Sequence, residues 1–407
     1  MIDVLVVGGG PAGLSAAIAL RRLGVGRVVV VEREQELGGI PRHTTHTGFG
    51  LRDLHRVLDG PAYAGRLIDE ADRTGVELRP GTSAVGWSGA LSVDLVGPAA
   101  PLAPVPARAV VLATGTRERP RSARLVPGDR PAGVLTTGAL QQLAVAEPTA
   151  IGRRAVIVGA EHVSFSAVLT LAHAGARTVA MVTDLPRHQT YRPLWAATAV
   201  RHRVPVLTGV AIARIVGRRR VEAVELTDGR RIECDTVVFT GDWVPENELA
   251  RRAGLMTVPG SLAPVVDAAL RTERPGVFAA GNLLHGAETA DVCALDGRHV
   301  AAAVTAWLAD GRWPSSGVPV AAESPVRWVH PSVVRPGAPP ARSRYLLRVD
   351  RFVAGRRLAV VQSDRVLWAG PSRGALVPNR AISIPSGWED RVDPAGGPVL
   401  VTVADVR

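Results

Sequence analysis

Two segments of the sequence repeat one pattern, and this repetition constrains the fold more than any other feature. Residues 3–33 read as an apolar strand, a glycine-rich turn, a helix and a second apolar strand. Residues 153–184 repeat these elements in the same order. A strand, glycine turn, helix and strand form the unit from which nucleotide-binding sheets are built. The sequence therefore predicts an internal duplication of a nucleotide-binding unit.

The first glycine turn, residues 8–13, has the spacing of a dinucleotide-binding turn. Gly8 would make the tight turn, Gly10 would let the backbone approach a pyrophosphate, and Gly13 would let the helix pack against the strand. Glu32 ends the next strand, where an acid can hold ribose hydroxyls. These features predict a working site with the pyrophosphate at the positive end of the helix. The alternative is a glycine turn that binds nothing.

The second glycine turn, residues 159–164, differs at two of its three key positions, because it has Gly159, Glu161 and Ser164. A side chain at position 161 would intrude on a pyrophosphate, and its carboxylate would repel the phosphates. Two unit charges about 4 Å apart repel by roughly 1 kcal/mol in water and by several times more when partly buried. We therefore predict a weak or vestigial nicotinamide site.

The alternative is a working second site in which His162, Arg153 or Arg154 neutralises Glu161. Asp184 lies near the end of the second strand of this unit, where an arginine would read the 2′-phosphate of NADP. If the second site works, we therefore expect it to prefer NAD to NADP.

The composition is that of a soluble globular protein, with 46% hydrophobic and 21% charged residues in a chain of 407. All 48 basic residues are arginine, which excludes a catalytic lysine, and the formal net charge is +11. Because the arginines are scattered, a GC-rich coding bias explains them better than nucleic-acid binding, although the excess favours anionic ligands or an acidic partner protein. No apolar stretch has the length of a membrane span and no targeting segment is evident, so we expect a cytoplasmic protein.

Three later motifs identify the nucleotide of the first site through a family resemblance. ELGGI at 36–40, LATG at 112–115 and TERPGVFAAGN at 272–282 resemble the FAD fingerprints of two-dinucleotide-domain flavoproteins of the glutathione and thioredoxin reductase type. Within that superfamily, GGIPRHTTHTGFG at 38–50 and AAGNLLHG at 279–286 most resemble the flavoproteins found beside glycerol-3-phosphate dehydrogenases. The large subunits of opine, sarcosine and cyanide-forming amine oxidases are more distant relatives in this comparison.

This resemblance covers essentially the whole chain and implies its architecture. We expect an α/β fold with two Rossmann-like dinucleotide-binding domains, the second inserted in the first, plus a small C-terminal all-β domain. The expected boundaries are 1–120 with 243–312 for the FAD-binding domain, 121–242 for the NAD(P)-binding-like domain, 313–342 for a Pro-rich connector without regular structure, and 343–407 for the β domain.

The resemblance also implies bound FAD, with its isoalloxazine near the GGI and TGFG segments. Asn282 stands where many relatives have an aspartate that contacts the ribityl chain, and a helix beginning near Ala290 would direct its positive end at the N1/O2 edge of the flavin. The residues expected to bind FAD are Gly8, Gly10, Pro11, Ala12, Gly13, Glu32, Arg33, Gly38, Gly39, Ile40, Arg42, Gly48, Ala84, Ala113, Thr114, Gly115, Gly281, Asn282, Ala290 and Asp291.

The chemistry is expected to be flavin hydride transfer without a redox disulfide. The only cysteines, Cys234 and Cys293, are far apart and form no CxxC pair, which argues against disulfide reduction, a disulfide framework and a zinc site. His43, His46 and His285 are the candidate catalytic residues, because a histidine can take a proton as hydride leaves carbon. The alternative is that these histidines only fix the flavin, cap a loop or lie in the interior.

Three functions remain open at this point. The first is a flavoenzyme, alone or as the flavin subunit of a heteromeric dehydrogenase, that oxidises a small amine, amino acid or polyol. The second is an NAD(P)H-dependent reductase that passes electrons to a protein or small acceptor, which requires that Glu161 be tolerated. The third is a non-catalytic subunit in which FAD and the β domain serve assembly.

Overall fold

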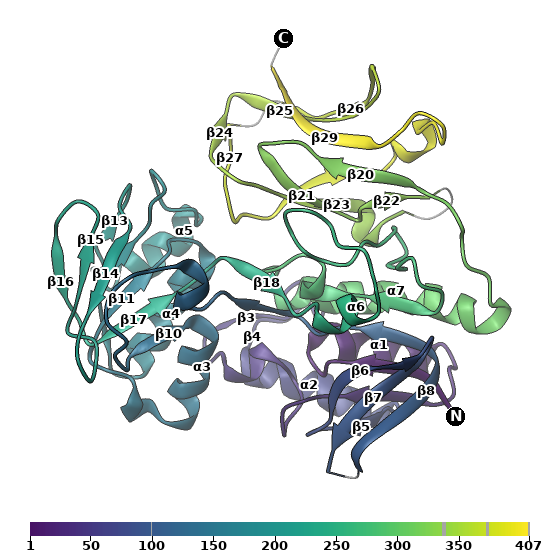
Figure 1. Cartoon of the computed structure of the whole chain (residues 1–407), viewed down its shortest axis with the longest axis horizontal. Coiled ribbons are helices and arrows are strands. Elements are labelled where there is room, and N and C mark those ends of the chain that lie inside the picture. The colour runs from purple at the N-terminus through teal and green to yellow at the C-terminus, as the bar shows by residue number, and fades with distance from the viewer. Residues whose placement is uncertain (99, 336–338, 372–373, 406–407) are drawn as a thin grey trace. The chain divides into compact units, whose positions relative to one another are not determined.

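The computed structural model describes residues 1–98, 100–335, 339–371 and 374–405, and the chain forms two compact units (Figure 1). The first unit comprises Met1–Arg42, Gly48–Thr116 and Pro245–Arg407, and the second comprises His43–Thr47 and Arg117–Val244. The second unit is thus inserted in the first, as expected. The chain crosses between them through β9 (Thr116–Glu118) and β18 (Trp243–Pro245), and these two strands pair with each other.

The first unit is built on a mixed sheet whose parallel central strands are almost entirely apolar. β1 (Ile2–Val7) and β2 (Val28–Val31) read IDVLVV and VVVV, and such runs suit strands that are buried on both faces. β8 (Ala100–Leu112) lies on the other side of β1 and also pairs with β19 (Val277–Ala279), so two distant parts of the chain complete one sheet. The other strands of this sheet are β5 (Glu77–Arg79), β6 (Ser83–Gly89) and β7 (Ser92–Gly97).

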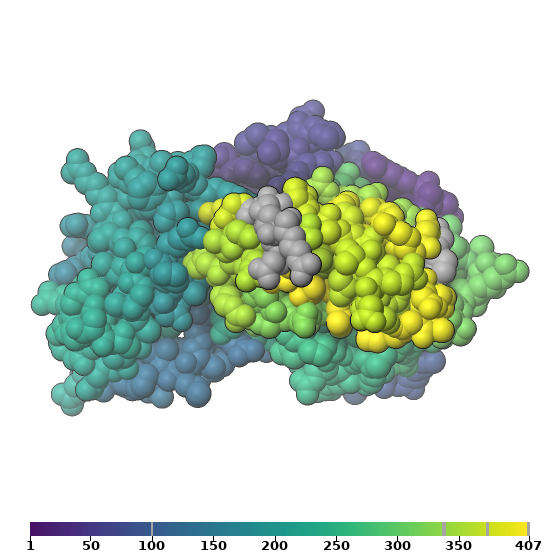
Figure 2. Space-filling model, turned by 90° about the horizontal axis from the view of Figure 1, so that it is seen from above, coloured from purple at the N-terminus to yellow at the C-terminus, as the bar shows by residue number. Residues whose placement is uncertain are grey.

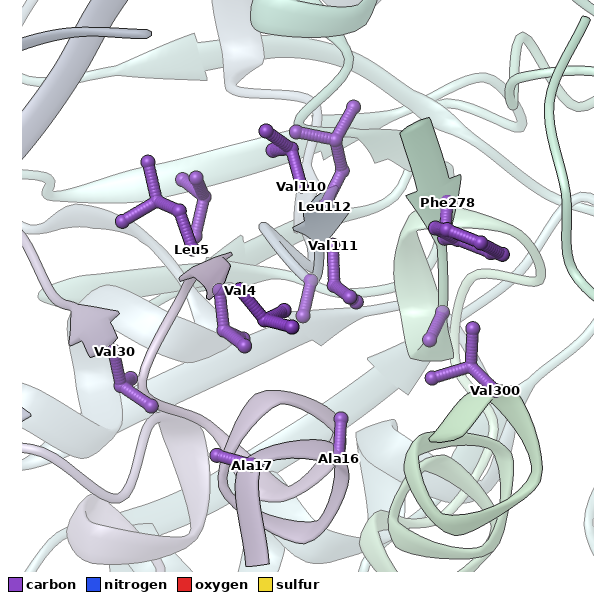
Figure 3. Close-up of a cluster of buried hydrophobic side chains, with 14 of the residues drawn as sticks. Val4, Leu5, Ala16, Ala17, Val30, Val110, Val111, Leu112, Phe278 and Val300 are labelled. Carbon is purple, nitrogen blue, oxygen red and sulfur yellow. The ribbon is translucent and has the colours of Figure 1, made fainter. Parts of the chain in front are cut away.

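Two helices pack closely on one face of this sheet, α1 (Pro11–Arg22) and α7 (Ala290–Asp310). Their approach depends on a glycine, because a Cβ at Gly297 would lie 2.1 Å from the carbonyl oxygen of Ala12. Figure 3 shows the result: side chains from β1, β2, β8 and β19 meet those of α1 and α7 in one apolar core. The unit also contains α2 (Gly60–Arg73), α6 (Glu248–Arg252), β3 (Thr47–Phe49) and β4 (Leu58–Asp59).

The second unit repeats the parallel arrangement on a smaller scale. Its sheet has the order β10 (Val134–Thr136), β17 (Thr236–Phe239), β11 (Arg154–Val158), β12 (Arg177–Val182) and β13 (Val206–Leu207). The helix that follows β11 is α4 (His162–His173), so β11, α4 and β12 reproduce β1, α1 and β2. The remaining elements are α3 (Thr137–Ala146), α5 (Arg192–Trp195) and the antiparallel strands β14 (Ile212–Val216), β15 (Ala223–Leu226) and β16 (Arg231–Glu233).

The β region, residues 318–405, completes the first unit and covers its near face in Figure 2. It begins earlier than expected, because the Pro-rich segment contains three strands and is not an irregular connector. Pro325 and Pro331 lie outside these strands and Pro319 lies near the beginning of one, where a missing N–H does little harm. Its strands are β20 (Val318–Ala322), β21 (Val326–His330), β22 (Val333–Val334), β23 (Arg344–Val349), β24 (Val353–Ala354), β25 (Arg356–Gln362), β26 (Arg365–Ala369), β27 (Ala375–Leu376), β28 (Ile382–Pro385) and β29 (Val399–Asp405).

A buried polar layer attaches the β region to the rest of the first unit. Glu288 and Arg348 form an ion pair with side chains that are almost fully buried, and the Arg348 guanidinium lies 5.2 Å from the centre of the Trp328 ring. Val292 of α7 packs in the same cluster as Trp328. Within the described part of the chain, no helix combines the length and apolar character needed to cross a membrane.

Candidate functional site

The first glycine turn joins β1 to α1 and leaves the start of the helix uncapped by any side chain. Gly8 has a φ of 113°, and a Cβ there would lie 2.3 Å from the carbonyl oxygen of Ala113. Gly10 precedes the helix, and Pro11 is its first residue. Proline suits this position because its fixed φ matches the helix and its missing N–H would have no partner there. A Cβ at Gly13 would lie 1.9 Å from the Gly8 carbonyl oxygen. The first and third glycines are therefore required by the fold itself.

Two other segments are held against the first glycine turn. The Glu32 carboxylate accepts hydrogen bonds from the backbone N–H groups of Gly9 at 2.8 Å and Glu34 at 3.0 Å. The backbone N–H of Gly38 donates to the Gly9 carbonyl at 2.8 Å. A Cβ at Gly39 would lie 3.0 Å from the Cα of Gly10. The fold thus brings the terminal acid of β2 and the GGI segment beside the turn.

Three glycines of the expected FAD site have open space beside them. A Cβ at Gly10 would meet only the Cα of Gly39, at 3.9 Å, and one at Gly48 or Gly115 would meet nothing within 4 Å. The helix start at α1 combines this open space with backbone N–H groups that no side chain caps. Uncapped N–H groups at a helix start form an anion-binding site. The residues present therefore suit the pyrophosphate of FAD.

Hydrogen bonds of the Asn282 side chain close the loop that precedes α7. The Asn282 side chain donates to the Glu288 carbonyl and accepts from the Glu288 N–H, both at 3.0 Å. Gly281 lies against α1, because a Cβ there would be 2.6 Å from the Ala12 Cβ. The Asp291 carboxylate is buried in the first turn of α7 and accepts from the Arg52 N–H at 3.1 Å. Ala290 begins this helix.

The other residues expected to bind FAD are distributed over the first unit. The Thr114 hydroxyl donates to the Glu246 carbonyl at 2.7 Å, which fixes the loop after β8. Arg33 is exposed and lies 3.8 Å from a Glu246 carboxylate oxygen, and the Arg42 side chain pairs with Glu34. Ile40 is exposed, and Ala84 packs in β6 against the main core.

The predicted catalytic histidines are divided between the two units. His43 and His46 belong to the short segment that groups with the second unit, and the His46 Nε2 lies 2.6 Å from the Ser166 hydroxyl on α4. His285 is in the first unit, only 3% exposed, and its Nε2 bonds to the Asp296 carboxylate. A small cavity next to this pair is lined by His330 and other residues of the β region, and burial lowers the pKa of His330 to about 3.

The second glycine turn contains an internal anion. Glu161 is 4% exposed and caps α4 in a reciprocal arrangement, with its carboxylate at the Ser164 N–H and the Ser164 hydroxyl accepting from the Glu161 N–H at 3.2 Å. The Ser164 hydroxyl also lies 2.6 Å from the Thr240 hydroxyl. A Cβ at Gly241 would lie 3.3 Å from the carboxylate. The carboxylate therefore occupies the helix start where a pyrophosphate would bind.

Arg124 is an arginine whose charge interacts with the Glu161 carboxylate, and no sequence pattern indicated this interaction. Its guanidinium donates to the carbonyls of Thr240 at 2.9 Å and Gly241 at 2.8 Å. Burial lowers the pKa of Arg124, while nearby carboxylates, including Glu161, oppose this effect. Burial raises the pKa of Glu118, and the neighbouring Glu161 charge raises it further. No sequence spacing connects these residues, since Arg124 and Glu118 lie some forty residues before the turn.

Of the arginines that the sequence suggested as partners of Glu161, Arg154 lies elsewhere, with its guanidinium 3.4 Å from Glu233. The backbone N–H groups of Arg153 and Arg154 both donate to the Asp235 carboxylate.

Both cysteines are free, buried and unsuited to a thiol relay. Burial raises the pKa of the Cys234 thiol to about 12 and that of Cys293 well above its ordinary value. A thiol relay needs an accessible thiolate. The first unit therefore offers a dinucleotide cradle without a redox disulfide.

Two dinucleotide-binding folds, one inserted in the other, with an open glycine cradle in the first, define a class of flavin- and nicotinamide-dependent oxidoreductases. Residues 2–297 match the family model described as pyridine nucleotide-disulphide oxidoreductase, and the chain belongs to this family. Members typically bind FAD and NAD(P), so the chain is a member of a flavin-dependent oxidoreductase family.

Three similar proteins illustrate the range of the family. An opine oxidase subunit of Agrobacterium tumefaciens (strain Ach5) is 28% identical over 333 residues, which cover 71% of this chain and 63% of the relative. The biphenyl dioxygenase system ferredoxin–NAD(+) reductase component of Paraburkholderia xenovorans (strain LB400) is 30% identical over 298 residues, covering 70% and 68%. T. acidophilum thioredoxin reductase shares the fold, with a TM-score of 0.63 at 20% identity, covering 76% of this chain and 98% of that chain.

These findings confirm the predicted superfamily, the duplicated fold with a β-rich C-terminal region and the similarity to opine oxidase subunits. The chain spans less than two thirds of the opine oxidase subunit that it matches. The individual FAD contacts and the catalytic histidines stay predictions.

Proposed function

We propose that this chain is the flavin-bearing component of a dehydrogenase or oxidase that takes hydride from a small amine, amino acid or polyol and does not receive it from a nicotinamide. The observation that carries this proposal is the Glu161 carboxylate in the second glycine turn. FAD bound in the first unit would supply the two-electron acceptor. Substrate-derived electrons would then leave to a partner subunit or a small acceptor.

The carboxylate opposes nicotinamide binding in two ways. It already satisfies the helix start of α4, so a pyrophosphate would gain less there than at an uncapped helix. It is also buried, and a second anion placed beside it would be repelled more strongly than in water. The charge of Arg124 is shared among Glu161, Asp242 and Glu118 and is not dedicated to a bound phosphate.

The reaction needs a proton acceptor as well as a hydride acceptor. Loss of hydride from carbon and of a proton from the attached nitrogen or oxygen leaves an imine or a carbonyl. His43 and His46 are our candidates for the proton acceptor, because both lie in the segment that joins the GGI motif to β3. Both thiols are buried singly, which supports chemistry at the flavin alone.

A heteromeric assembly is supported by the similarity to a protein named as one of the subunits of an opine oxidase. The similarity extends over 71% of this chain. We therefore propose that this chain has two kinds of partner, which are a small-molecule substrate and a second oxidoreductase chain.

Anaerobic reduction of the purified flavoprotein tests this function. NADH, NADPH and a panel of small amines, amino acids and polyols are mixed separately with the protein, and the loss of the oxidised-flavin band at about 450 nm is followed. We expect bleaching by a member of the amine, amino acid or polyol panel, none by NADH or NADPH on the same time scale, and full bleaching by dithionite. Rapid bleaching by NADH would contradict the proposal.

The second candidate is an NAD(P)H-dependent reductase of a protein or small acceptor. The observation that favours it is the 30% identity to a ferredoxin–NAD(+) reductase component. In that case the Glu161 side chain must move when the nicotinamide binds, and NADH must bleach the flavin as rapidly as the acceptor turns over.

A further inference from the structure

A cavity of about 570 Å³ lies in the first unit, outside the candidate flavin site. We call it the arginine cavity, because five arginines line it. Its walls come from α1, α2, the loop before β4 and α7. The lining residues are Ser15, Ile18, Ala19, Arg22, Leu23, Leu54, Arg56, Arg66, Leu67, Asp69, Glu70, Arg73 and Arg298. None of the twenty residues expected to bind FAD is among them.

The cavity combines an apolar floor with a positively charged rim. Ile18 and Leu67 are buried in its floor, whereas the arginines extend to the surface. Only two of the lining side chains are acidic, and one of them, Glu70, is already held by Arg22 and Arg73. Five guanidinium groups against two carboxylates leave a net positive charge at the rim.

Three polar groups in the cavity have no partner in the described chain. Arg56 and Arg66 form no side-chain hydrogen bond or ion pair there. The Ser15 hydroxyl is also unpaired, although the residue is only 2% exposed. Buried side-chain hydroxyls without a partner are uncommon in folded proteins. Arg56 and Arg66 are exposed, so their unpaired guanidinium groups are accessible to an anion that enters the cavity.

We propose that the arginine cavity binds a small organic anion with an apolar body and a phosphate or carboxylate head. The volume lies in the range of small-molecule sites, but eight of the thirteen lining residues are polar or charged, which favours a ligand with a charged head over a purely apolar one. The head lies between Arg56 and Arg66, whose planar guanidinium groups suit oxygen pairs of phosphate or carboxylate. The body of the ligand covers Ile18 and Leu67.

Titration calorimetry on the FAD-loaded protein tests this site with four probes: phenyl phosphate, benzoate, phenol and inorganic phosphate. Saturating FAD excludes binding of the probes in the flavin cradle. We expect phenyl phosphate or benzoate to bind at least about tenfold more tightly than phenol and inorganic phosphate, because only they combine body and head. The relative affinities of phenyl phosphate and benzoate distinguish a phosphate ligand from a carboxylate ligand.

Matched variants locate the binding. The double variant Arg56→Ala/Arg66→Ala should weaken binding at least about tenfold, whereas Arg219→Ala, at an exposed arginine of the second unit, should leave it unchanged. FAD content and the unfolding midpoint verify that each variant is folded.

Three results would overturn the proposal. The first is no saturable heat with phenyl phosphate or benzoate up to about 1 mM. The second is equal binding to the wild-type protein and to the double variant. The third is a change in the oligomeric state of the double variant, which would assign the arginines to an acidic protein surface instead of a small ligand. The test measures binding and not turnover, so its result is independent of the proposed oxidation reaction.

Discussion

The two glycine turns begin in the same way and then diverge. Gly8 and Gly159 both have positive φ, 113° and 135°, and a Cβ at either would lie within 2.3 Å of a neighbouring oxygen. At the next key position, Gly10 has open space beside it, whereas Glu161 fills the equivalent place with a buried carboxylate. The fold therefore requires a glycine at the first position of both turns, whereas the residue at the second position determines whether a ligand has room to bind.

The third key position, Gly13 in the first turn and Ser164 in the second, also differs between the two turns. Gly13 has no room for a Cβ, yet Ser164 is accommodated and uses its hydroxyl to complete the cap of α4. The second turn thus has an internal anion at its helix start and the same strand–turn–helix geometry. A dinucleotide-binding fold can remain intact when its anion site is filled by its own side chain.

The largest expected effect comes from giving the first turn the acid of the second. Gly10→Glu should weaken FAD binding at least about thousandfold, roughly 4 kcal/mol, because the carboxylate takes the space of the pyrophosphate and repels it. The protein itself has room at this position, so the variant should still fold. FAD retained per chain after gel filtration measures the loss. Gly10→Ala is the control for size alone, and an unchanged FAD content in the glutamate variant would contradict the comparison.

The next effect concerns stability. Gly13→Ala should lower the free energy of unfolding by about 3 kcal/mol, because its Cβ would overlap the Gly8 carbonyl oxygen, 1.9 Å away. Ser164→Gly is the matched change in the second turn. It removes hydrogen bonds and places a glycine in the first turn of α4 without creating a steric overlap, so it should cost about 1–2 kcal/mol. Urea unfolding followed by circular dichroism measures both, and equal losses would show that the third position has the same role in both turns.

A smaller effect is expected when the acid of the second turn is removed. Glu161→Gly should strengthen NADH binding at least about tenfold, near 1.4 kcal/mol, because the helix start of α4 becomes free. Glu161→Gln removes the charge and keeps the bulk, so it should give part of this gain. NADH titration followed by fluorescence provides the measurement. If neither variant binds NADH better than the wild type, another part of the second unit prevents binding.

The smallest expected effect is a loss of folding stability in acid that arises from His330 of the first unit. The pKa of His330 is about 3 in the folded protein, against an ordinary value of 6.5, so the unfolded chain binds more protons between these values. Stability from this group is therefore present above about pH 6.5 and lost as the pH falls toward 3, by about 1 kcal/mol between about pH 7.5 and 5.5. His330→Asn should flatten this dependence, measured by urea midpoints. The exposed His55, replaced by Asn, is the control and should leave the slope unchanged.

The elements near each glycine turn were predictable because their causes are local. Apolar runs in Val4–Val7 and Val28–Val31 specify buried parallel strands, and the glycines specify the turn between strand and helix. The acid at position 161 could likewise be recognised as an obstacle, since its spacing from Gly159 fixes its place at the helix start.

The Pro-rich segment shows where local reasoning failed. Prolines predicted irregular structure, yet β20 pairs with β29, some eighty residues later. Such pairing depends on a partner that is distant in sequence, and prolines at strand ends do not prevent it.

The sequence by itself determined the duplicated fold, the open first turn and the obstructed second turn, because each depends on sterics within a few residues. Only the tertiary structure decided that the Arg124 guanidinium bonds the Thr240 and Gly241 carbonyls, and that five arginines surround one cavity. These features join residues that are far apart in the chain. Their existence depends on the packing of whole elements, which no local spacing encodes.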